Sequence, residues 1–290
     1  MGWKRSVLED WDEGAIADSD TSKTVKLPQA LISAIHLRLS GTGGAGTPAV
    51  DNLLATIKIK TKNGYITDLQ SADDLLIARA LTGRKPTITN SSGAYTETNH
   101  SLYFGRFPKD KAFMLDLTND NVRMIEVTFG TLIATTAWAT TTVKLTVTVD
   151  YWQGTPPSEY TGQFFSWKQV EDKATGTLKA TFELFNGVRL AGLWIVIGTI
   201  TTIRQVTIGD KPMSIIFGKT NFRDLVNIHN LEVNPDTAET VVALWKFWED
   251  QGQSFMTDLP VLSMSDPVCT IERGATTSTS RVVQCSVVPN

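Results

Sequence analysis

The segment "LLATIKIKTKNGYITDLQSADDLLIARAL", residues 53–81, shares its order of short elements with "ITTIRQVTIGDKPMSIIFGKTNFRDLVNIHN", residues 200–230. The first copy opens with alternating apolar residues, Ile57 and Ile59, which is the pattern of a half-buried strand. The second copy opens in the same way, with Val206 at the position that matches Ile57. A turn, a second apolar strand and a short helix then follow in both copies. This recurrence predicts a duplicated fold.

The two short helices are predicted from their first residues. Ser71 precedes Asp74 by three positions, and Asn221 precedes Asp224 by the same interval. In such a pair the small polar side chain accepts a hydrogen bond from a free backbone N–H, and the acid reaches back toward the cap. Because both helix starts fall at the same place in their copies, they support the duplication.

The rest of the chain has mainly the pattern of β-strands. Apolar residues alternate in several runs, including Ile35, Leu37 and Leu39 in one run and Val143, Leu145, Val147 and Val149 in another. Clusters rich in Gly, Asn, Pro and Asp separate these runs, and Lys62-Asn63-Gly64 is typical of a tight hairpin turn. The pattern therefore predicts an all-β protein with a few short helices.

The duplication divides the chain into two halves. We predict an N-terminal arm over residues 1–23, a first β-roll over 24–152 and a second, similar β-roll over 164–290. The stretch "QGTPPSEYTGQ", residues 153–163, is rich in Pro and Gly and is predicted to be a linker. Each half also has a longer apolar strand upstream of its copy of the repeat.

Two longer amphipathic helices are expected outside the repeat. Apolar residues of the arm fall on one helical face, and the basic pair Lys4 and Arg5 lies among them. We expect this arm to contact an internal membrane or a neighbouring subunit, or to dock on its own roll, through Trp3, Lys4, Arg5, Val7, Leu8 and Trp11. The acidic residues that follow favour contact with protein, with only the tip near lipid.

The second amphipathic helix is predicted in "NPDTAETVVALWKFWEDQG", residues 234–252. Asp236 and Glu239 have the spacing of a capping box, and an apolar stripe follows them. We expect this helix to pack against a roll or between subunits through Val241, Val242, Trp245 and Trp248.

Composition excludes several classes of function. The net charge of −3 and the pI of about 5.7 do not indicate direct, sequence-specific binding of nucleic acid. With three histidines and two cysteines the chain has too few ligands for a His/Cys metal cluster, and no cofactor motif is present. No nucleophile elbow, zinc-protease motif or phosphate-binding loop occurs, and the adjacent carboxylates are better explained by capping and solvation. We expect a protein that is not an enzyme, with no secretory leader.

Cys269 and Cys285 flank a turn-rich segment near the end of the chain. They could face each other across a terminal hairpin and form a disulfide. In a reducing compartment they would instead remain small buried hydrophobic residues, which is the interpretation that we favour.

The duplicated order and the segment "HSLYFGRFPKDKAFMLDLTNDNVRMIEVTF", residues 100–129, resemble a known family. They are similar to the double-jelly-roll major capsid proteins of tailless icosahedral viruses, the lineage that includes adenovirus hexon. In smaller members an aromatic "YFGR" segment precedes an acidic, apolar loop and the next strand. The resemblance spans residues from about 24 to 290 and rests on order and length.

The resemblance implies that each chain forms two eight-stranded rolls and that three chains form a pseudo-hexagonal capsomer. The implied partners are the chain itself as a homotrimer and capsid lattice, minor capsid or penton proteins, and an internal lipid membrane. The implied location is the virion of a bacteriophage or archaeal virus, assembled in the host cytoplasm. Two alternatives remain open, namely a carbohydrate-binding, lectin-like β-sandwich and a single jelly roll with an appended β-domain.

Overall fold

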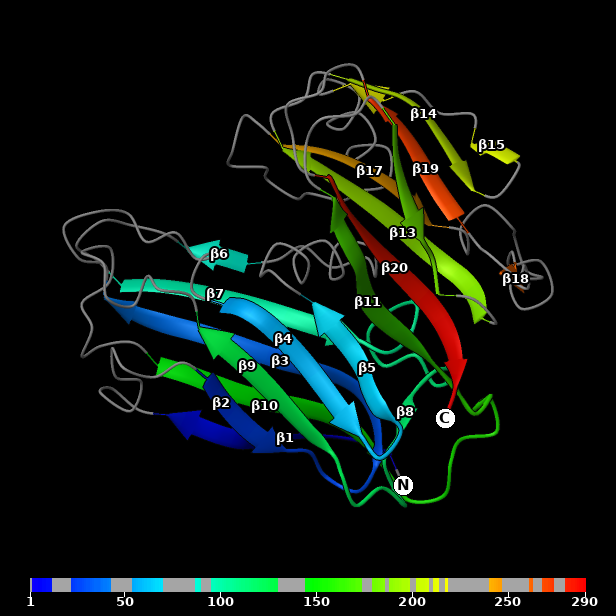
Figure 1. The fold of residues 1–290 in the computed structure, drawn as a ribbon. Coiled ribbons are helices and arrows are strands. Elements are labelled where there is room, and N and C mark those ends of the chain that lie inside the picture. Colours follow the sequence, from blue (N-terminus) through cyan, green and yellow to red (C-terminus); the bar gives the residue numbers. More distant parts are fainter. Residues whose placement is uncertain are drawn as a thin grey trace. The chain divides into compact units, whose positions relative to one another are not determined.

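In the computed structural model, the chain forms two compact units. The first comprises Met1–Phe165 and Pro289–Asn290, and the second comprises Ser166–Val288. Each unit is described by itself (Figure 1). The described residues are 2–11, 22–42, 54–69, 87–89, 95–129, 144–173, 179–185, 188–198, 202–208, 211–213, 217–218, 240–246, 261–262, 268–273 and 280–290.

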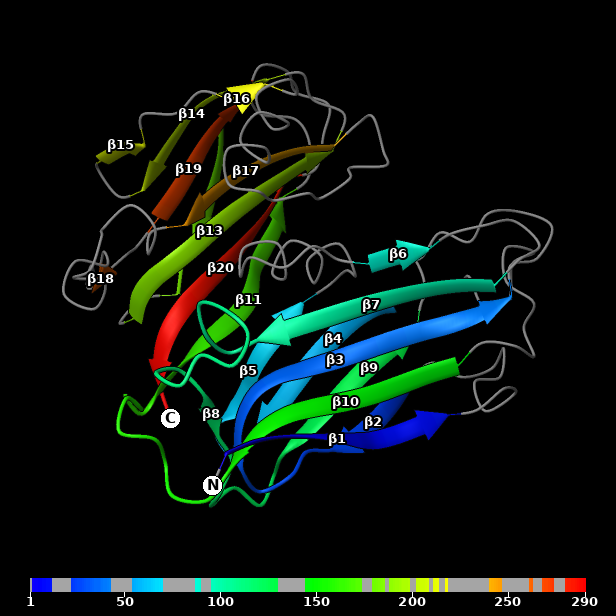
Figure 2. The ribbon, with the colours of Figure 1, turned by 180° about the vertical axis from the view of Figure 1, so that it is seen from behind.

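The first unit consists of two antiparallel sheets. One sheet has the order β1-β10-β3-β7-β6, with strands Gly2–Trp11, Lys144–Gln153, Leu31–Thr42, Tyr95–Tyr103 and Thr87–Thr89, and the short β8 (Leu115–Asp116) also pairs with β3. The other has the order β2-β9-β4-β5, with strands Ser22–Lys26, Met124–Phe129, Leu54–Thr61 and Gly64–Leu69. Figure 2 shows β1, β10, β3 and β7 side by side.

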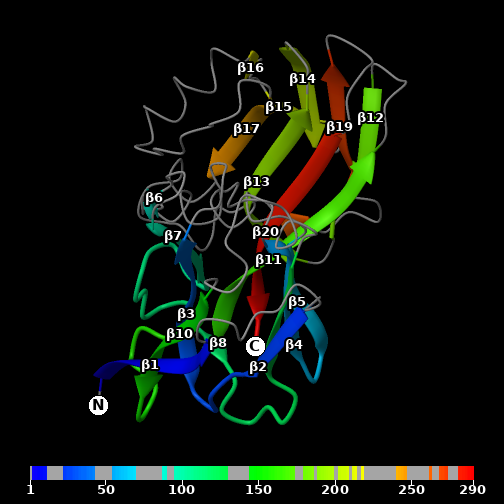
Figure 3. The same ribbon diagram turned by 90° about the vertical axis from the view of Figure 1, so that its left-hand side faces the viewer.

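The second unit has two sheets as well. One has the order β11-β20-β13-β17, with strands Gln163–Lys173, Ser280–Pro289, Val188–Gly198 and Thr240–Lys246, and β18 (Val261–Leu262) pairs with β13. The other has the order β12-β19-β14-β15, with strands Lys179–Glu183, Val268–Arg273, Thr202–Ile208 and Lys211–Met213, and β16 (Phe217–Gly218) pairs with β14. Figure 3 shows the strands of this unit from the side.

The strand orders of the two units match. The order β1-β10-β3-β7 corresponds to β11-β20-β13-β17, and β2-β9-β4-β5 corresponds to β12-β19-β14-β15. The hairpin β4–β5 therefore corresponds to β14–β15, which are the strands that carry the repeat quoted above. The duplicated order and the all-β class that the sequence predicted are confirmed, and the part of the chain that the structure describes contains no helix.

Alternation of apolar residues builds the core, as expected. Along β10 the side chains of Leu145, Val147 and Val149 are completely buried, whereas those between them are partly exposed. On β4 the matching pair is Ile57 and Ile59, which are also completely buried. A strand buries every second side chain when one of its faces covers a core.

The hairpin between β4 and β5 has the turn that the sequence predicted. Lys62 and Asn63 form the turn, and Gly64 follows it with a φ of 101°. Glycine adopts this left-handed conformation without the steric penalty that a Cβ atom would bring.

The predicted N-terminal helix is wrong, because residues 2–11 form strand β1. This strand pairs antiparallel with β10 over its length, from Gly2 opposite Gln153 to Trp11 opposite Leu145. The apolar residues near the start of the chain fit a strand as well as a helix. The partner strand β10, whose residues follow those of β1 by 134 to 151 positions, decides in favour of a strand, and no local pattern reveals it.

The predicted helix at residues 234–252 is wrong where the structure describes it. Residues Thr240–Lys246 form strand β17, which pairs with β13 and sets Trp245 opposite Leu193. The β-branched run Thr240, Val241 and Val242 favours a strand because branching at Cβ restricts χ1. Trp248 lies outside the described residues, as do the predicted short helices at 71–81 and 220–230.

Both cysteines are free and buried. Cys269 lies on β19 and Cys285 on β20, and these strands belong to different sheets rather than to one hairpin. Burial raises the pKa of Cys269 to about 12 and that of Cys285 well above its ordinary value. The interpretation as small buried hydrophobic residues is therefore confirmed.

Candidate functional site on the outer face of the first sheet

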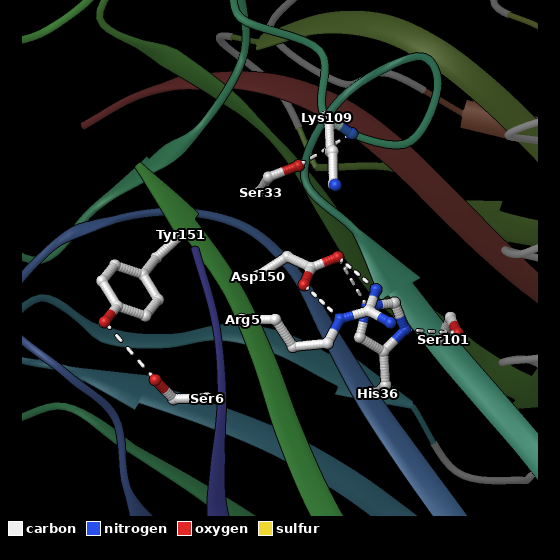
Figure 4. Close-up of polar contacts among 8 residues, drawn as sticks. All are labelled: Arg5, Ser6, Ser33, His36, Ser101, Lys109, Asp150 and Tyr151. Atoms are coloured by element: carbon white, nitrogen blue, oxygen red, sulfur yellow. Dashed lines mark hydrogen bonds and ion pairs between the residues drawn. The ribbon is translucent and has the colours of Figure 1, made fainter. Parts of the chain in front are cut away.

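A polar network lies on the outer face of the β1-β10-β3-β7 sheet, opposite the apolar core. Four strands contribute to it: Arg5 comes from β1, Asp150 from β10, His36 from β3 and Ser101 from β7. The register sets Arg5 opposite Asp150 and His36 opposite Ser101. Figure 4 shows these four side chains converging.

Asp150 is the centre of the network. Its side chain is 3% exposed and accepts two hydrogen bonds from Arg5, from Nε at 2.5 Å and from Nη2 at 2.6 Å. The second oxygen also lies 3.1 Å from Nε2 of His36. The other ring nitrogen of His36 is 2.8 Å from the hydroxyl oxygen of Ser101. The carboxylate is thus held from two neighbouring strands.

The environment keeps Asp150 ionised. Burial alone would raise the pKa of the Asp150 carboxyl, but hydrogen bonds from Arg5 and His36 and their charges outweigh it and hold the pKa well below its ordinary value. The hydrogen bond to Asp150 likewise raises the pKa of Arg5. The network is therefore a largely buried ion pair that opens to solvent on the arginine side, where the side chain is 60% exposed.

A serine, a histidine and an aspartate in line also invite comparison with a hydrolase triad, but the surroundings do not suit one. Ser101 is 3% exposed and lies within strand β7, so a substrate carbonyl cannot approach its oxygen. A triad aspartate orients its histidine and stabilises the imidazolium that forms during the reaction, whereas both oxygens of Asp150 accept hydrogen bonds from Arg5. The arrangement fits a structural clamp that ties the edge strand β1 to the sheet.

The "YFGR" segment forms a second ordered polar site, in the loop after β7. Asp110, which is 2% exposed, accepts hydrogen bonds from Nε of Arg106 at 2.7 Å, from Nη2 of Arg106 at 3.0 Å, and from the backbone N–H groups of Arg106 and Ala112. A Cβ atom on Gly105 would lie 2.7 Å from Cβ of Asp110, so only glycine fits there. This loop is fixed by one buried carboxylate.

The same loop is attached to strand β3. Lys109 has a φ of 61°, the only positive φ of a non-glycine residue in the part described here. Its backbone N–H donates to the hydroxyl oxygen of Ser33 at 3.0 Å, a contact that Figure 4 also shows. A lysine in the left-handed region is strained, and the Ser33 contact helps to hold it.

The structure places the residues of the predicted arm in different surroundings along strand β1. Trp3 and Arg5 lie on the outer face, where they meet Trp152 and Asp150. Val7 is 61% exposed, and the register shifts between Val7 and Glu9, so that Leu8 is the extra residue of a bulge. Lys4 is opposite Tyr151 and is exposed. Trp11 pairs with Leu145 through its backbone.

Sequence reasoning missed His36, Ser101 and Asp150. Their positions lie up to 114 residues apart and carry no shared motif, so only the register of the sheet brings them together. Among the described residues, no three His, Cys, Asp or Glu side chains are grouped so as to hold a metal ion. That same part of the chain also lacks any helix with the length and apolar character needed to cross a bilayer.

Comparison with known proteins places the fold. No protein family and no curated protein matches the sequence. Among solved structures, the chain is similar to the STIV major capsid protein, with a TM-score of 0.67 and 13% identity over 99% of this chain and 97% of that one. For the major capsid protein P2 from bacteriophage PM2 the TM-score is 0.63, with 14% identity over 99% of both chains. For the Faustovirus major capsid protein the TM-score is 0.55, with 8% identity over 100% of this chain and 90% of that one.

The chain has the double-jelly-roll fold of these capsid proteins. The match extends over nearly the full length of both chains, so it includes both units. The fold that the sequence resemblance implied is confirmed, and the alternative of a single jelly roll with an appended β-domain is excluded by the matching strand orders.

Proposed function

We propose that the chain is a major capsid protein, the structural subunit of an icosahedral viral shell. The observation that carries this proposal is the duplicated strand order in one chain, β1-β10-β3-β7 and β11-β20-β13-β17. The same fold, at nearly the same length, occurs in the major capsid proteins of STIV, bacteriophage PM2 and Faustovirus. On this proposal the polar networks serve stability rather than catalysis.

The proposed assembly is a homotrimer that acts as a pseudo-hexagonal capsomer. Two similar rolls in each chain give six similar rolls in three chains, so a hexagonal outline needs only three-fold symmetry. Heterologous contacts close into a ring when the rotation between subunits is one third of a turn. Strand β17, which carries Val241, Val242 and Trp245, is a candidate for packing within a roll or between subunits.

The proposed partners follow from the shell. They are further copies of the trimer in the lattice, minor capsid or penton proteins, and an internal lipid membrane. The proposed location is the virion after assembly in the host cytoplasm. The proposed contact of β1 with the inner side of the shell or a neighbour would use its exposed residues, among them Lys4 and Val7.

Electron microscopy of the purified protein tests the proposal. We expect particles with a six-lobed outline and three-fold symmetry, and closed shells when assembly is induced by concentration and salt. Small particles without three-fold symmetry, together with binding to immobilised glycans, would contradict the proposal and favour the carbohydrate-binding alternative.

A further inference from the structure

Asn290 is bound to the first unit through both polar groups of its side chain. Its Oδ1 accepts a hydrogen bond from the N–H of Asp116 at 2.7 Å. Its Nδ2 donates to the carbonyl of Met114 at 3.0 Å and to the hydroxyl oxygen of Tyr160 at 2.8 Å. The backbone N–H of Asn290 donates to the carbonyl of Gly162 at 3.0 Å. Figure 2 shows this end of the chain beside β8. All four partners precede the second unit in the chain.

An amide side chain suits this position because it carries an acceptor and two N–H donors on one planar group. Met114 and Asp116 flank Leu115, which pairs with Ile32 of β3. Along a strand the backbone groups of successive residues point to opposite edges, so the carbonyl of Met114 and the N–H of Asp116 point to the edge opposite β3. Asn290 binds these two groups as a neighbouring strand would.

The part of the chain that leads to the second unit binds the same edge. The carbonyl of Ala112 accepts hydrogen bonds from the N–H of Thr161 at 3.0 Å and from its hydroxyl at 2.7 Å. The N–H of Met114 donates to the carbonyl of Gln163 at 3.1 Å. Asn290 therefore continues a row of contacts that begins with the residues just before the second unit.

Both ends of the second unit are thus fixed to the first unit at neighbouring points. The chain leaves the first unit after Phe165, whose N–H donates to the carbonyl of Phe104 at 2.9 Å, and re-enters it at Pro289. Fixing both ends of a segment reduces the number of conformations that it can adopt when unfolded, which raises its free energy of unfolding. The contacts of Asn290 lie within the first unit but act in this way on the stability of the second.

These contacts are at the surface, so they open more readily than the core of either unit. Asn290 and Pro289 are exposed, and Tyr160 is partly exposed. Hydrogen bonds exposed to solvent open at a low cost in free energy. Burial, together with the charge of Asp116, raises the pKa of Tyr160 above its ordinary value. The hydroxyl that accepts from Asn290 therefore stays protonated at neutral pH.

We propose that Asn290 is a latch that holds the second unit as a loop closed at both ends. With the latch shut, residues 166–288 are fixed to the first unit at each end. With the latch open, they are attached to it only through the bond between Phe165 and Ser166. This inference goes beyond the proposed function, because the latch acts within one chain and needs no shell.

Hydrogen exchange with mass spectrometry on the full-length protein tests the latch. Asn290→Ala should speed exchange in strands β13 and β14 of the second unit about ten-fold, because it removes three solvent-exposed hydrogen bonds. Exchange in strands β3 and β10 of the first unit should stay unchanged. Tyr160→Phe removes one of the three hydrogen bonds and should speed exchange in β13 and β14 about two-fold.

Asn63→Ala is the matched control. Asn63 is an exposed asparagine of the first unit, and its side chain forms no hydrogen bond within the part of the chain that the structure describes. The substitution is chemically the same as Asn290→Ala, and it should change exchange in neither β13 nor β14. Each variant is compared with the wild-type protein at the same mass, measured by light scattering, so the result does not depend on whether the chain forms a trimer.

Three results would overturn the inference. Faster exchange confined to the residues next to Asn290 would show a local contact that does not hold the second unit. Equal acceleration in both units would show that Asn290 stabilises the chain as a whole. Equal exchange in Asn290→Ala and Asn63→Ala throughout the protein would show that the hydrogen bonds of Asn290 contribute nothing.

Discussion

The two units have the same strand order but bury different kinds of polar side chain. In the described part of the first unit three carboxylates are buried, those of Asp110, Asp120 and Asp150. In the described part of the second unit the buried polar side chains are neutral, namely Ser166, Gln284 and Ser286. The order of the strands therefore does not depend on buried charge. What both units share is strands that bury alternate side chains, such as β10 in the first unit and β12 in the second.

The buried carboxylates of the first unit anchor segments that the sheets do not fix by themselves. Asp150 holds the edge strand β1 through Arg5, and Asp110 holds the loop after β7. Asp120 accepts the N–H of Lys62 at the β4–β5 turn and the N–H of Val122. Gln284 in the second unit accepts the N–H of Phe185 at 2.9 Å and donates to its carbonyl at 3.0 Å. An amide can serve both backbone groups of one residue, which a carboxylate cannot.

The largest destabilisation of the first unit relative to the second is expected from Gly105→Ala. The new Cβ atom would lie 2.7 Å from Cβ of Asp110, which four hydrogen bonds hold in place. We expect a loss of about 3 kcal/mol in the free energy of opening of the first unit, measured by hydrogen exchange with mass spectrometry. Gly2→Ala, where no atom lies within 4 Å of the new Cβ, is the control and should be neutral.

Arg5→Ala should destabilise the first unit by about 2 kcal/mol at neutral pH, because it leaves a buried carboxylate with one fewer charged partner. The second unit should be unaffected. Arg38→Ala removes the exposed pair with Glu97 and should cost less than about 1 kcal/mol. Equal losses from the two arginine variants in urea unfolding would show that burial of Asp150 does not matter.

Acid should lower the stability of the first unit more than that of the second. The folded-state pKa of Asp150 is lowered, so its contribution is present above the unfolded-state value of about 4 and is lost as the pH falls below it. Hydrogen exchange between pH 7 and pH 3 should show the first unit losing protection around β1 and β10 before the core of the second unit does. Arg5→Ala should make that loss shallower. Equal loss in both units would contradict the comparison.

Among substitutions of buried groups, the smallest effect is expected from Gln284→Ala in the second unit. It leaves the N–H and carbonyl of Phe185 without their side-chain partner and should cost about 1 kcal/mol. Because no charge is removed, the cost should be the same at neutral and acid pH. A cost that changes with pH would mean that a charged group is coupled to Gln284.

The strands and their duplication could be predicted because they depend on local patterns. Ile57 and Ile59, or Leu145 and Val147, alternate in the sequence and are buried alternately in the structure. Strands β1 and β17 could not be predicted in this way. Trp3, Val7 and Val241 fit both a helical and an extended pattern, and the partner strands β10 and β13 decide in favour of strands.

The polar sites could not be predicted from local sequence patterns, for the same physical reason. Asp150 and Arg5 are 145 residues apart, and only the antiparallel register of β1 and β10 brings them into contact. The "YFGR" segment gave a partial signal, because Arg106 and Asp110 are four residues apart and Gly105 precedes them. The segment alone does not reveal that Asp110 is buried, because this burial depends on the packing of the whole unit.

The mass of the purified protein in solution, measured by light scattering after size exclusion, tests the capsid proposal most directly. We expect three times the 31.8 kDa of the chain, because the paired rolls would serve a closed three-fold ring. A monomer of 31.8 kDa that stays monomeric at high concentration and binds glycans would contradict it.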